Sequence, residues 1–332
     1  MCTAYPRGVS EPHAPGIPPR RRGRSTVSFV LLAIVVAFAV YALARNWSEV
    51  TDDIAQMSVL DLVLSTGSAA IGLFFSAFAW RSLLGGMGAS PRLHDAFTIY
   101  FAGQLGKYVP GSVWPAVIQA ELGRRSNIAR LTMVASYVVA LMVALATGSV
   151  IGLLVLFGPA RDSLWPAVVG AATLGVALGV LLYDARWLNR AGAWAGTRIR
   201  REIPSVHTSP RSVVLAAVLQ LCGWVFWGLH AWLIARPLGA GADLVLPTIG
   251  GFAFAFVAGL VVIPLPAGAG IREAVLIVML SGDIGRPGAI TVSLVSRLLM
   301  AVAELLLAAL FGVRRAAGYR RSSATPPVEH DG

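Results

Sequence analysis

Long apolar runs separated by short polar segments dominate the chain. A membrane-spanning helix needs about 20 predominantly apolar residues to cross the hydrocarbon core of a bilayer. Six runs are close to that length, and they cover residues 27–44, 59–80, 131–157, 164–183, 212–235 and 288–312. This pattern predicts an all-α fold, that of a polytopic helical membrane protein with six full spans.

Two further apolar stretches are interrupted near their middle by proline and glycine. Residues 92–123 are broken at Pro110-Gly111, and residues 246–281 are broken over 264–270. Proline and glycine disfavour the interior of a helix, so we expect each stretch to form two half-helices of a re-entrant hairpin. If residues 246–281 instead cross the membrane fully, they form two spans and the protein has eight.

The composition agrees with a protein embedded in a membrane. Of the 332 residues, 56% are hydrophobic and only 13% are charged, and the mean hydropathy is +0.72. These values exclude a sizeable soluble domain, which needs far more polar surface. The net charge of +11 would suit a nucleic-acid-binding protein. Nearly all the arginines, however, lie in short segments between apolar runs, where they encode membrane topology. No nucleic-acid partner is expected.

The distribution of basic residues orients the predicted spans. With the N-terminus inside, the cytoplasmic segments contain twenty arginines and the outer segments contain four. Cytoplasmic loops carry an excess of Lys and Arg. We therefore expect a multi-pass protein of the cytoplasmic (plasma) membrane with both termini in the cytoplasm. The stretch 92–123 then enters and leaves from the cytoplasmic side, and the stretch 246–281 from the outer side.

The two ends of the chain are polar. Residues 1–25, rich in proline and arginine, are predicted to form a disordered cytoplasmic tail. Residues 26–315 are predicted to form the transmembrane domain, and residues 316–332 a second disordered cytoplasmic tail. The arginine cluster at 20–24 and the apolar run after it also resemble a cleaved signal peptide. The length of the run and the spans that follow favour an uncleaved first span.

Lys107, Arg272, Glu273, Arg297 and Glu304 are charged residues that lie close to a break or within the last run. A charge at membrane depth costs roughly 2.5–3.5 kcal/mol on insertion scales, so such residues usually serve a function. Lys107 is the only lysine in the chain. It lies beside the first break, where it either binds an anion or extends toward the membrane interface.

Each break is followed by a new half-helix. The N-terminus of a helix presents unpaired amides and the positive end of the helix dipole, which favour an anion. We therefore expect substrate-binding groups at both breaks. They are Lys107, Tyr108, Pro110, Gly111 and Ser112 in the first stretch, and Gly268, Gly270, Arg272 and Glu273 in the second.

Arg297 and Glu304 lie seven residues apart, and therefore on one face of the last predicted span. They are interpreted as a gating or structural charge pair, placed to pair with Glu273 and Arg272 respectively. His230, in an apolar run, is interpreted as a packed or interfacial residue. No acid–base, nucleophile or metal-ligand constellation is recognisable, so we expect no catalytic residue, no metal, no cofactor and no enzymatic activity.

Two segments resemble the motifs of a known family. GQLGKYVPGSVW at 103–114, followed by ELGRR at 121–125, is similar to the signature of the lysylphosphatidylglycerol synthase transmembrane-region family. PLPAGAGIRE at 264–273 resembles the family's second motif, and Arg297 lies where the family's last span often carries an arginine. The resemblance covers roughly residues 27–315.

The resemblance implies a flippase-like module that moves a charged lipid between leaflets. In full-length members a separate soluble domain attaches the amino acid, and this chain is expected to be a stand-alone member without that domain. We expect a translocator of a phospholipid or a polyprenyl-linked glycolipid, with anionic membrane lipids as partners. The alternative is a non-transporting membrane subunit that docks or regulates a lipid-modifying or glycosyl-transferring enzyme.

Overall fold

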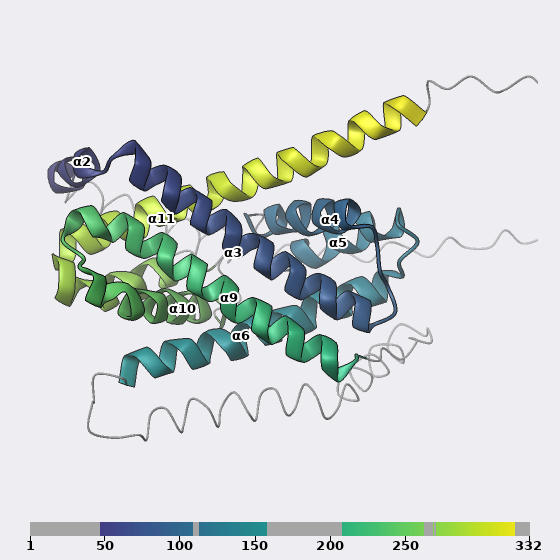
Figure 1. The fold of residues 1–332 in the computed structure, drawn as a ribbon, viewed down its shortest axis with the longest axis horizontal. Helices are drawn as coiled ribbons and strands as arrows, with labels where there is room; N and C mark the ends of the chain where they lie inside the picture. The colour runs from purple at the N-terminus through teal and green to yellow at the C-terminus, as the bar shows by residue number, and fades with distance from the viewer. Residues whose placement is uncertain (1–46, 109–112, 158–207, 262–267, 269, 323–332) are drawn as a thin grey trace, which may run out of the picture.

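The computed structural model describes residues 47–108, 113–157, 208–261, 268 and 270–322. Within these residues it contains eight α-helices, joined by turns and short 3₁₀ segments (Figure 1). The helices are α2 (Trp47–Gln56), α3 (Val59–Gly86), α4 (Leu93–Leu105), α5 (Trp114–Arg124), α6 (Arg130–Phe157), α9 (Pro210–Ala235), α10 (Val245–Val261) and α11 (Ile271–Ser322). The prediction of an all-α fold is confirmed for the described part of the chain.

Local sequence signals fix where two of the long helices begin. The Ser58 hydroxyl accepts a hydrogen bond from the Asp61 amide at 3.2 Å, and the Asp61 carboxylate accepts one from the Ser58 amide at 3.2 Å. These reciprocal bonds form a capping box at the start of α3. Pro210 occupies the first turn of α9, where its missing amide hydrogen would have no helical partner in any case.

Helices α3 and α9 pack against each other in an antiparallel arrangement (Figure 1). At one end of this seam the Arg236 guanidinium donates to the Asp61 carboxylate at 2.8 Å. At the other end the Ser209 amide donates to the Gly86 carbonyl at 3.3 Å. We call the end with Asp61 the first end of the bundle and the end with Gly86 the second end.

Four predicted spans fall on described residues, and all four are helical. The runs at 59–80, 131–157, 212–235 and 288–312 correspond to α3, α6, α9 and the second part of α11. The predicted spans at 27–44 and 164–183 lie outside the described residues, as do the N-terminal tail and the last ten residues of the C-terminal tail.

The first interrupted stretch forms two short helices, α4 and α5, which contact each other. They lie at the opposite end of the bundle from α2 (Figure 1). There the Thr98 hydroxyl donates to the carbonyl of Phe311, far along α11, at 3.3 Å. Pro110-Gly111 lies outside the described residues, but α4 has ended before it and helical structure resumes at Trp114. The break therefore falls where proline and glycine predict it.

The second interrupted stretch forms α10 and the first part of α11. Helix α10 follows α9 after a short connection at the first end of the bundle. Helix α11 bends at Gly285, which has a non-helical φ of 74° and ψ of 162°. Beyond this bend, the Thr291 hydroxyl donates to the Asp53 carboxylate of α2 at 2.7 Å, again at the first end. Both arms of the stretch are thus anchored at the same end.

The break between α10 and α11 depends on glycine. Gly268 has a φ of +65°, and a Cβ there would lie 2.7 Å from the Cα and from the carbonyl oxygen of Gly259. A residue with a side chain would be strained in that conformation and would also collide with the backbone of α10. The end of α10 therefore packs directly on the break.

Five described helical segments are long and apolar enough to cross a membrane: Val59–Gly86, Arg130–Leu154, Pro210–Leu238, Ala242–Val261 and Ile271–Gly312. Along α11, Leu298 and Leu305 are exposed whereas Glu304 is buried. Apolar side chains facing outward and charges facing inward are the arrangement that a lipid environment requires. The fold is that of a multi-pass membrane protein.

Candidate functional site

A cavity of about 320 Å³ lies inside the bundle, where the two helix breaks approach each other. Its volume falls within the range of small-molecule sites. Every described α-helix except α2 contributes to the wall. The lining residues are Ser76, Tyr100, Gln104, Lys107, Tyr108, Tyr137, Gln220, Arg272, Arg297 and Glu304, together with the largely apolar set Leu73, Trp80, Pro115, Ala140, Leu141, Ala144, Trp227, Phe256, Gly259, Leu260, Gly268 and Met300.

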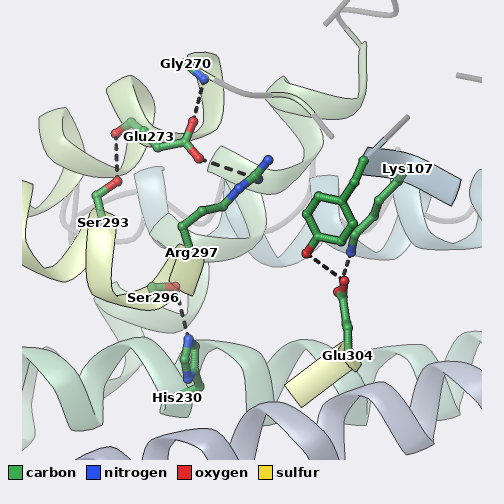
Figure 2. A network of polar contacts seen from close by, with 9 residues as sticks. Lys107, His230, Gly270, Glu273, Ser293, Ser296, Arg297 and Glu304 are labelled. Atoms are coloured by element: carbon green, nitrogen blue, oxygen red, sulfur yellow. Dashed lines mark hydrogen bonds and ion pairs between the residues drawn. The ribbon is translucent and has the colours of Figure 1, made fainter. Parts of the chain in front are cut away.

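The polar groups beside the first break converge on one carboxylate. The Lys107 ammonium donates to Oε1 of Glu304, and the Tyr108 hydroxyl donates to Oε2 at 2.8 Å (Figure 2). Glu304 is only 1% exposed, so its charge requires partners of this kind. These contacts join the break between α4 and α5 to the middle of the last apolar segment.

Arg272, in the first turn of α11, faces aromatic rings. Its guanidinium carbon lies 4.6 Å from the ring centroids of both Phe252 and Phe256. The residue is buried and lines the cavity. It forms no ion pair with any residue that the structure describes. Cation–π contacts stabilise a desolvated guanidinium, and so the aromatic faces take the place of a carboxylate here.

Glu273 and Arg297 form a second ion pair beside the cavity. Arg297 Nη1 lies 3.5 Å from Glu273 Oε1, and Oε2 accepts a hydrogen bond from the Gly270 amide at 2.6 Å (Figure 2). One carboxylate thus holds Arg297 and satisfies a backbone donor at the start of α11. The sequence predicted that this helix N-terminus would receive a substrate anion, whereas Glu273 already occupies that amide.

The charges around the cavity do not balance. Three cations, Lys107, Arg272 and Arg297, stand against two carboxylates, Glu273 and Glu304, which leaves one positive charge in excess among the described residues. In a medium of low dielectric constant an excess cation strongly attracts an anion. The remaining wall is mainly aromatic and aliphatic. The arrangement can therefore hold an anionic group that is attached to an apolar molecule.

The structure brings most of the predicted site residues together. Lys107, Tyr108, Gly268, Arg272, Arg297 and Glu304 line the cavity. Gly270 and Glu273 reach it through the contact with Arg297. Pro110, Gly111 and Ser112 lie outside the described residues.

One predicted charge pairing is confirmed and the other is wrong. Arg297 pairs with Glu273 as predicted, but Glu304 pairs with Lys107 and not with Arg272. The reason is the position of each group along α11. Glu304 lies two turns beyond Arg297, toward the second end of the bundle, which is where the break between α4 and α5 approaches α11. Arg272 belongs to the other break, whose two arms are anchored at the first end.

His230 is packed within the bundle, as predicted. The ring is fully buried. Its Nδ1 lies 2.7 Å from the Ser65 hydroxyl. Its Nε2 lies 3.0 Å from the Ser296 hydroxyl (Figure 2). The histidine therefore joins α9 to α3 and α11, and it does not line the cavity.

Several polar lining residues were not predicted. Tyr100 and Gln104 lie on α4, Tyr137 on α6, Ser76 on α3 and Gln220 on α9. Gln104 lies one turn before Lys107, and this spacing in the sequence could have indicated that Gln104 also lines the site. Gln220 is a lone amide in a long apolar run, where a polar side chain usually faces the protein interior. Nothing in the sequence indicates which part of the bundle Tyr137 would face.

The fold and the cavity define the class of this protein, a helical multi-pass membrane protein with an amphipathic internal site. The family model for the lysylphosphatidylglycerol synthase TM region matches residues 26–308. The chain therefore belongs to this family, in agreement with the two motifs in its sequence. A comparison with curated proteins finds no match.

Proposed function

We propose that the protein is a lipid translocator, which moves a phospholipid or a polyprenyl-linked glycolipid between leaflets. The lipid's phosphate or pyrophosphate headgroup would bind in the cavity. The observation that carries this proposal is an excess of positive charge in a cavity whose remaining wall is mainly aliphatic and aromatic. A lipid with an anionic headgroup matches both properties. The flippase-like function implied by the family motifs agrees with it.

We take the two interrupted stretches as re-entrant hairpins that enter from opposite faces of the membrane. Helices α4 and α5 contain 13 and 11 residues. At a rise of 1.5 Å per residue they are about 20 and 17 Å long, too short for a hydrocarbon core of about 30 Å. Both arms of the second stretch are anchored at the first end of the bundle. This geometry supports a headgroup site near the bilayer midplane.

The charge contacts suggest how a headgroup enters. Arg272 provides the first contact, because its guanidinium has no carboxylate partner among the described residues. Lys107 then exchanges Glu304 for the phosphate, while the hydroxyl of Tyr108 continues to stabilise the carboxylate. Movement of the hairpins against the surrounding helices opens the site to one leaflet or the other. No nucleotide-binding motif is recognisable, so an ion gradient or the lipid gradient drives the movement.

Mass spectrometry of co-purified lipids tests the proposal. Wild-type protein, the double variant Lys107→Met/Arg272→Met and the control Arg130→Met are purified and compared with bulk membrane lipid. Arg130 forms an exposed ion pair with Glu121, and neither residue lines the cavity, so the control removes a cation that is not part of the site. We expect one anionic lipid class to be enriched with the wild type and the control and lost from the double variant.

A lipid profile that matches bulk membrane in all three samples would contradict the headgroup site. That outcome would favour the alternative function, a membrane subunit that docks another enzyme.

A further inference from the structure

Three more polar residues line the cavity from α3 and α9. Ser76, Gln220 and Trp227 line it, and each is 5% exposed. The Ser76 hydroxyl, Nε2 of Gln220 and Nε1 of Trp227 have no hydrogen-bond partner among the residues that the structure describes. Buried polar groups in proteins are nearly always paired, so three such groups on one cavity require an explanation.

The three groups lie around the place where Gly72 of α3 approaches Gly223 of α9, since a Cβ on Gly72 would lie 3.1 Å from the Gly223 carbonyl oxygen. A Cβ on Gly223 would lie 3.2 Å from the Ser76 hydroxyl and 3.5 Å from Nε2 of Gln220. A Cβ on Gly72 would lie 2.5 Å from Nε1 of Trp227. Glycine at these two positions thus leaves room for the polar groups where the helices approach most closely.

An aromatic wall connects this cluster to the charged part of the cavity. The ring of Trp227 stacks on Phe256, with centroids 5.4 Å apart and planes inclined by 18°. Phe256 is also one of the two rings that contact the Arg272 guanidinium. A ligand whose anion lies at Arg272 would therefore extend along Phe256 toward the donor groups of α9.

Neighbouring tryptophans show that an unpartnered indole is not general in this bundle. Nε1 of Trp224 donates to the Thr147 hydroxyl at 3.0 Å, and Nε1 of Trp80 donates to the Ser136 hydroxyl at 3.1 Å. Trp227 lines the cavity as Trp80 does, but its N–H has no partner among the residues that the structure describes. Since an indole N–H and an amide NH₂ can only donate, the cluster matches acceptor oxygens and does not match an amine.

We propose that Ser76, Gln220 and Trp227 form a second subsite, which donates hydrogen bonds to uncharged oxygens near the phosphate of the lipid. Such oxygens are the ester carbonyls of a phosphoglycerolipid or the hydroxyls of a glycosyl phosphate. The inference rests on the proposed function, because it takes as ligand the lipid whose headgroup binds at Arg272. The subsite makes the cavity selective for the chemical group beside the phosphate, in addition to the phosphate itself.

Binding of matched lipid pairs to purified protein in detergent tests this proposal. The first pair is phosphatidylglycerol with ester-linked chains and its ether-linked analogue, which lacks the carbonyls. The second pair is a glycosyl phosphopolyprenol and the corresponding polyprenyl phosphate. The variants are Trp227→Phe, which keeps the stacked ring, and Gln220→Leu. The control is Trp224→Phe, the same change one turn away at an indole that does not line the cavity.

Within a pair, we expect the wild-type protein to bind the lipid that carries the extra oxygens more tightly than the other lipid, by about fivefold or more. One to two net hydrogen bonds provide a difference in affinity of this size. Trp227→Phe and Gln220→Leu should reduce this preference severalfold, and Trp224→Phe should retain it. Preference within the first pair identifies the ester carbonyls as the ligand, and preference within the second identifies the glycosyl group. No preference within either pair, or a preference that both variants retain, would overturn the subsite.

The unfolding temperature separates a binding role from a structural one. A lower unfolding temperature in Trp227→Phe with an unchanged preference would also overturn the proposal. Failure of the proposed function has a different signature. If Arg272→Met binds every phosphate probe as the wild type does, the headgroup site is wrong, whereas the preference within each pair still reports on the donor cluster.

Discussion

Glu304 is the most constrained single residue of the site. Its carboxylate is almost fully buried, and it is held by the Lys107 ammonium and the Tyr108 hydroxyl. Removing one partner of a buried ion pair leaves an uncompensated charge, which typically costs about 3–5 kcal/mol. Replacing both partners by neutral groups removes that penalty. The stability of the cavity wall therefore depends on the pair as a unit.

A double-mutant cycle measures this dependence. We expect Lys107→Met and Glu304→Gln each to destabilise the protein. The double variant should be less destabilised than the sum of the two single effects, by a coupling of about 1–3 kcal/mol. The side-chain amide that Glu304→Gln introduces can still accept the Tyr108 hydrogen bond. Thermal unfolding in one detergent, at one protein concentration, gives the four values. Additive effects would show that the contact between Lys107 and Glu304 carries no energy.

At the scale of helices, the glycine break before α11 sets the shape of the cavity. Gly268 adopts a positive φ and touches the backbone of Gly259. A non-glycine residue in such a conformation carries strain of about 1–3 kcal/mol, apart from any collision. The break is therefore encoded by residue type, and it is not simply a kink that packing imposes.

Gly268→Ala should lower the unfolding temperature and weaken the binding of anionic lipid, because the added methyl group forces α10 away from the break. Gly282→Ala is the matched control. Gly282 is helical within α11, and a Cβ there meets nothing within 4 Å. This control should be neutral or slightly stabilising, since alanine favours a helix. Equal behaviour of the two variants, in unfolding and in lipid binding, would refute the role assigned to the break.

Helices and breaks were largely predictable from the sequence, whereas contacts between them were not. The apolar runs fix α3, α6 and α9 because lipid imposes length and composition directly. Proline and glycine fix the two breaks. The two helical segments of α11 meet at the non-helical Gly285. They correspond to the second half of the stretch 246–281 and to the apolar run 288–312, which the sequence predicted as separate elements.

The candidate site was predictable where charge marks it. A charge is expensive in an apolar stretch, and so Lys107, Arg272, Arg297 and Glu304 stand out in the sequence. To predict which of these residues pair, one must know the relative depth of the two breaks in the bundle. No sequence pattern within one helix contains that information. Gln220 and Trp227 carry no charge, and only the packing of α9 against α3 brings them to the cavity.

For the whole molecule, we expect two loops to be exposed on opposite sides of the membrane. Ala129, before α6, and Ala242, before α10, are exposed residues at the second and first ends of the bundle. In a background with Cys2 and Cys222 replaced by serine, Ala129→Cys should react with an impermeant thiol reagent only from the cytoplasmic side. Ala242→Cys should react only from the outside. Labelling of both positions from one side would contradict the predicted topology.

Lipid movement in proteoliposomes tests whether the protein is a lipid translocator. Vesicles contain a headgroup-labelled anionic phospholipid, and an impermeant quencher reports how fast inner-leaflet lipid reaches the outer leaflet. We expect wild-type protein and Arg130→Met to accelerate this exchange relative to protein-free vesicles. Arg272→Met should slow it by about tenfold or more, as the loss of a charge-assisted contact implies. Exchange no faster than in protein-free vesicles, or equal in Arg272→Met and the wild type, would contradict a translocator that works through this cavity.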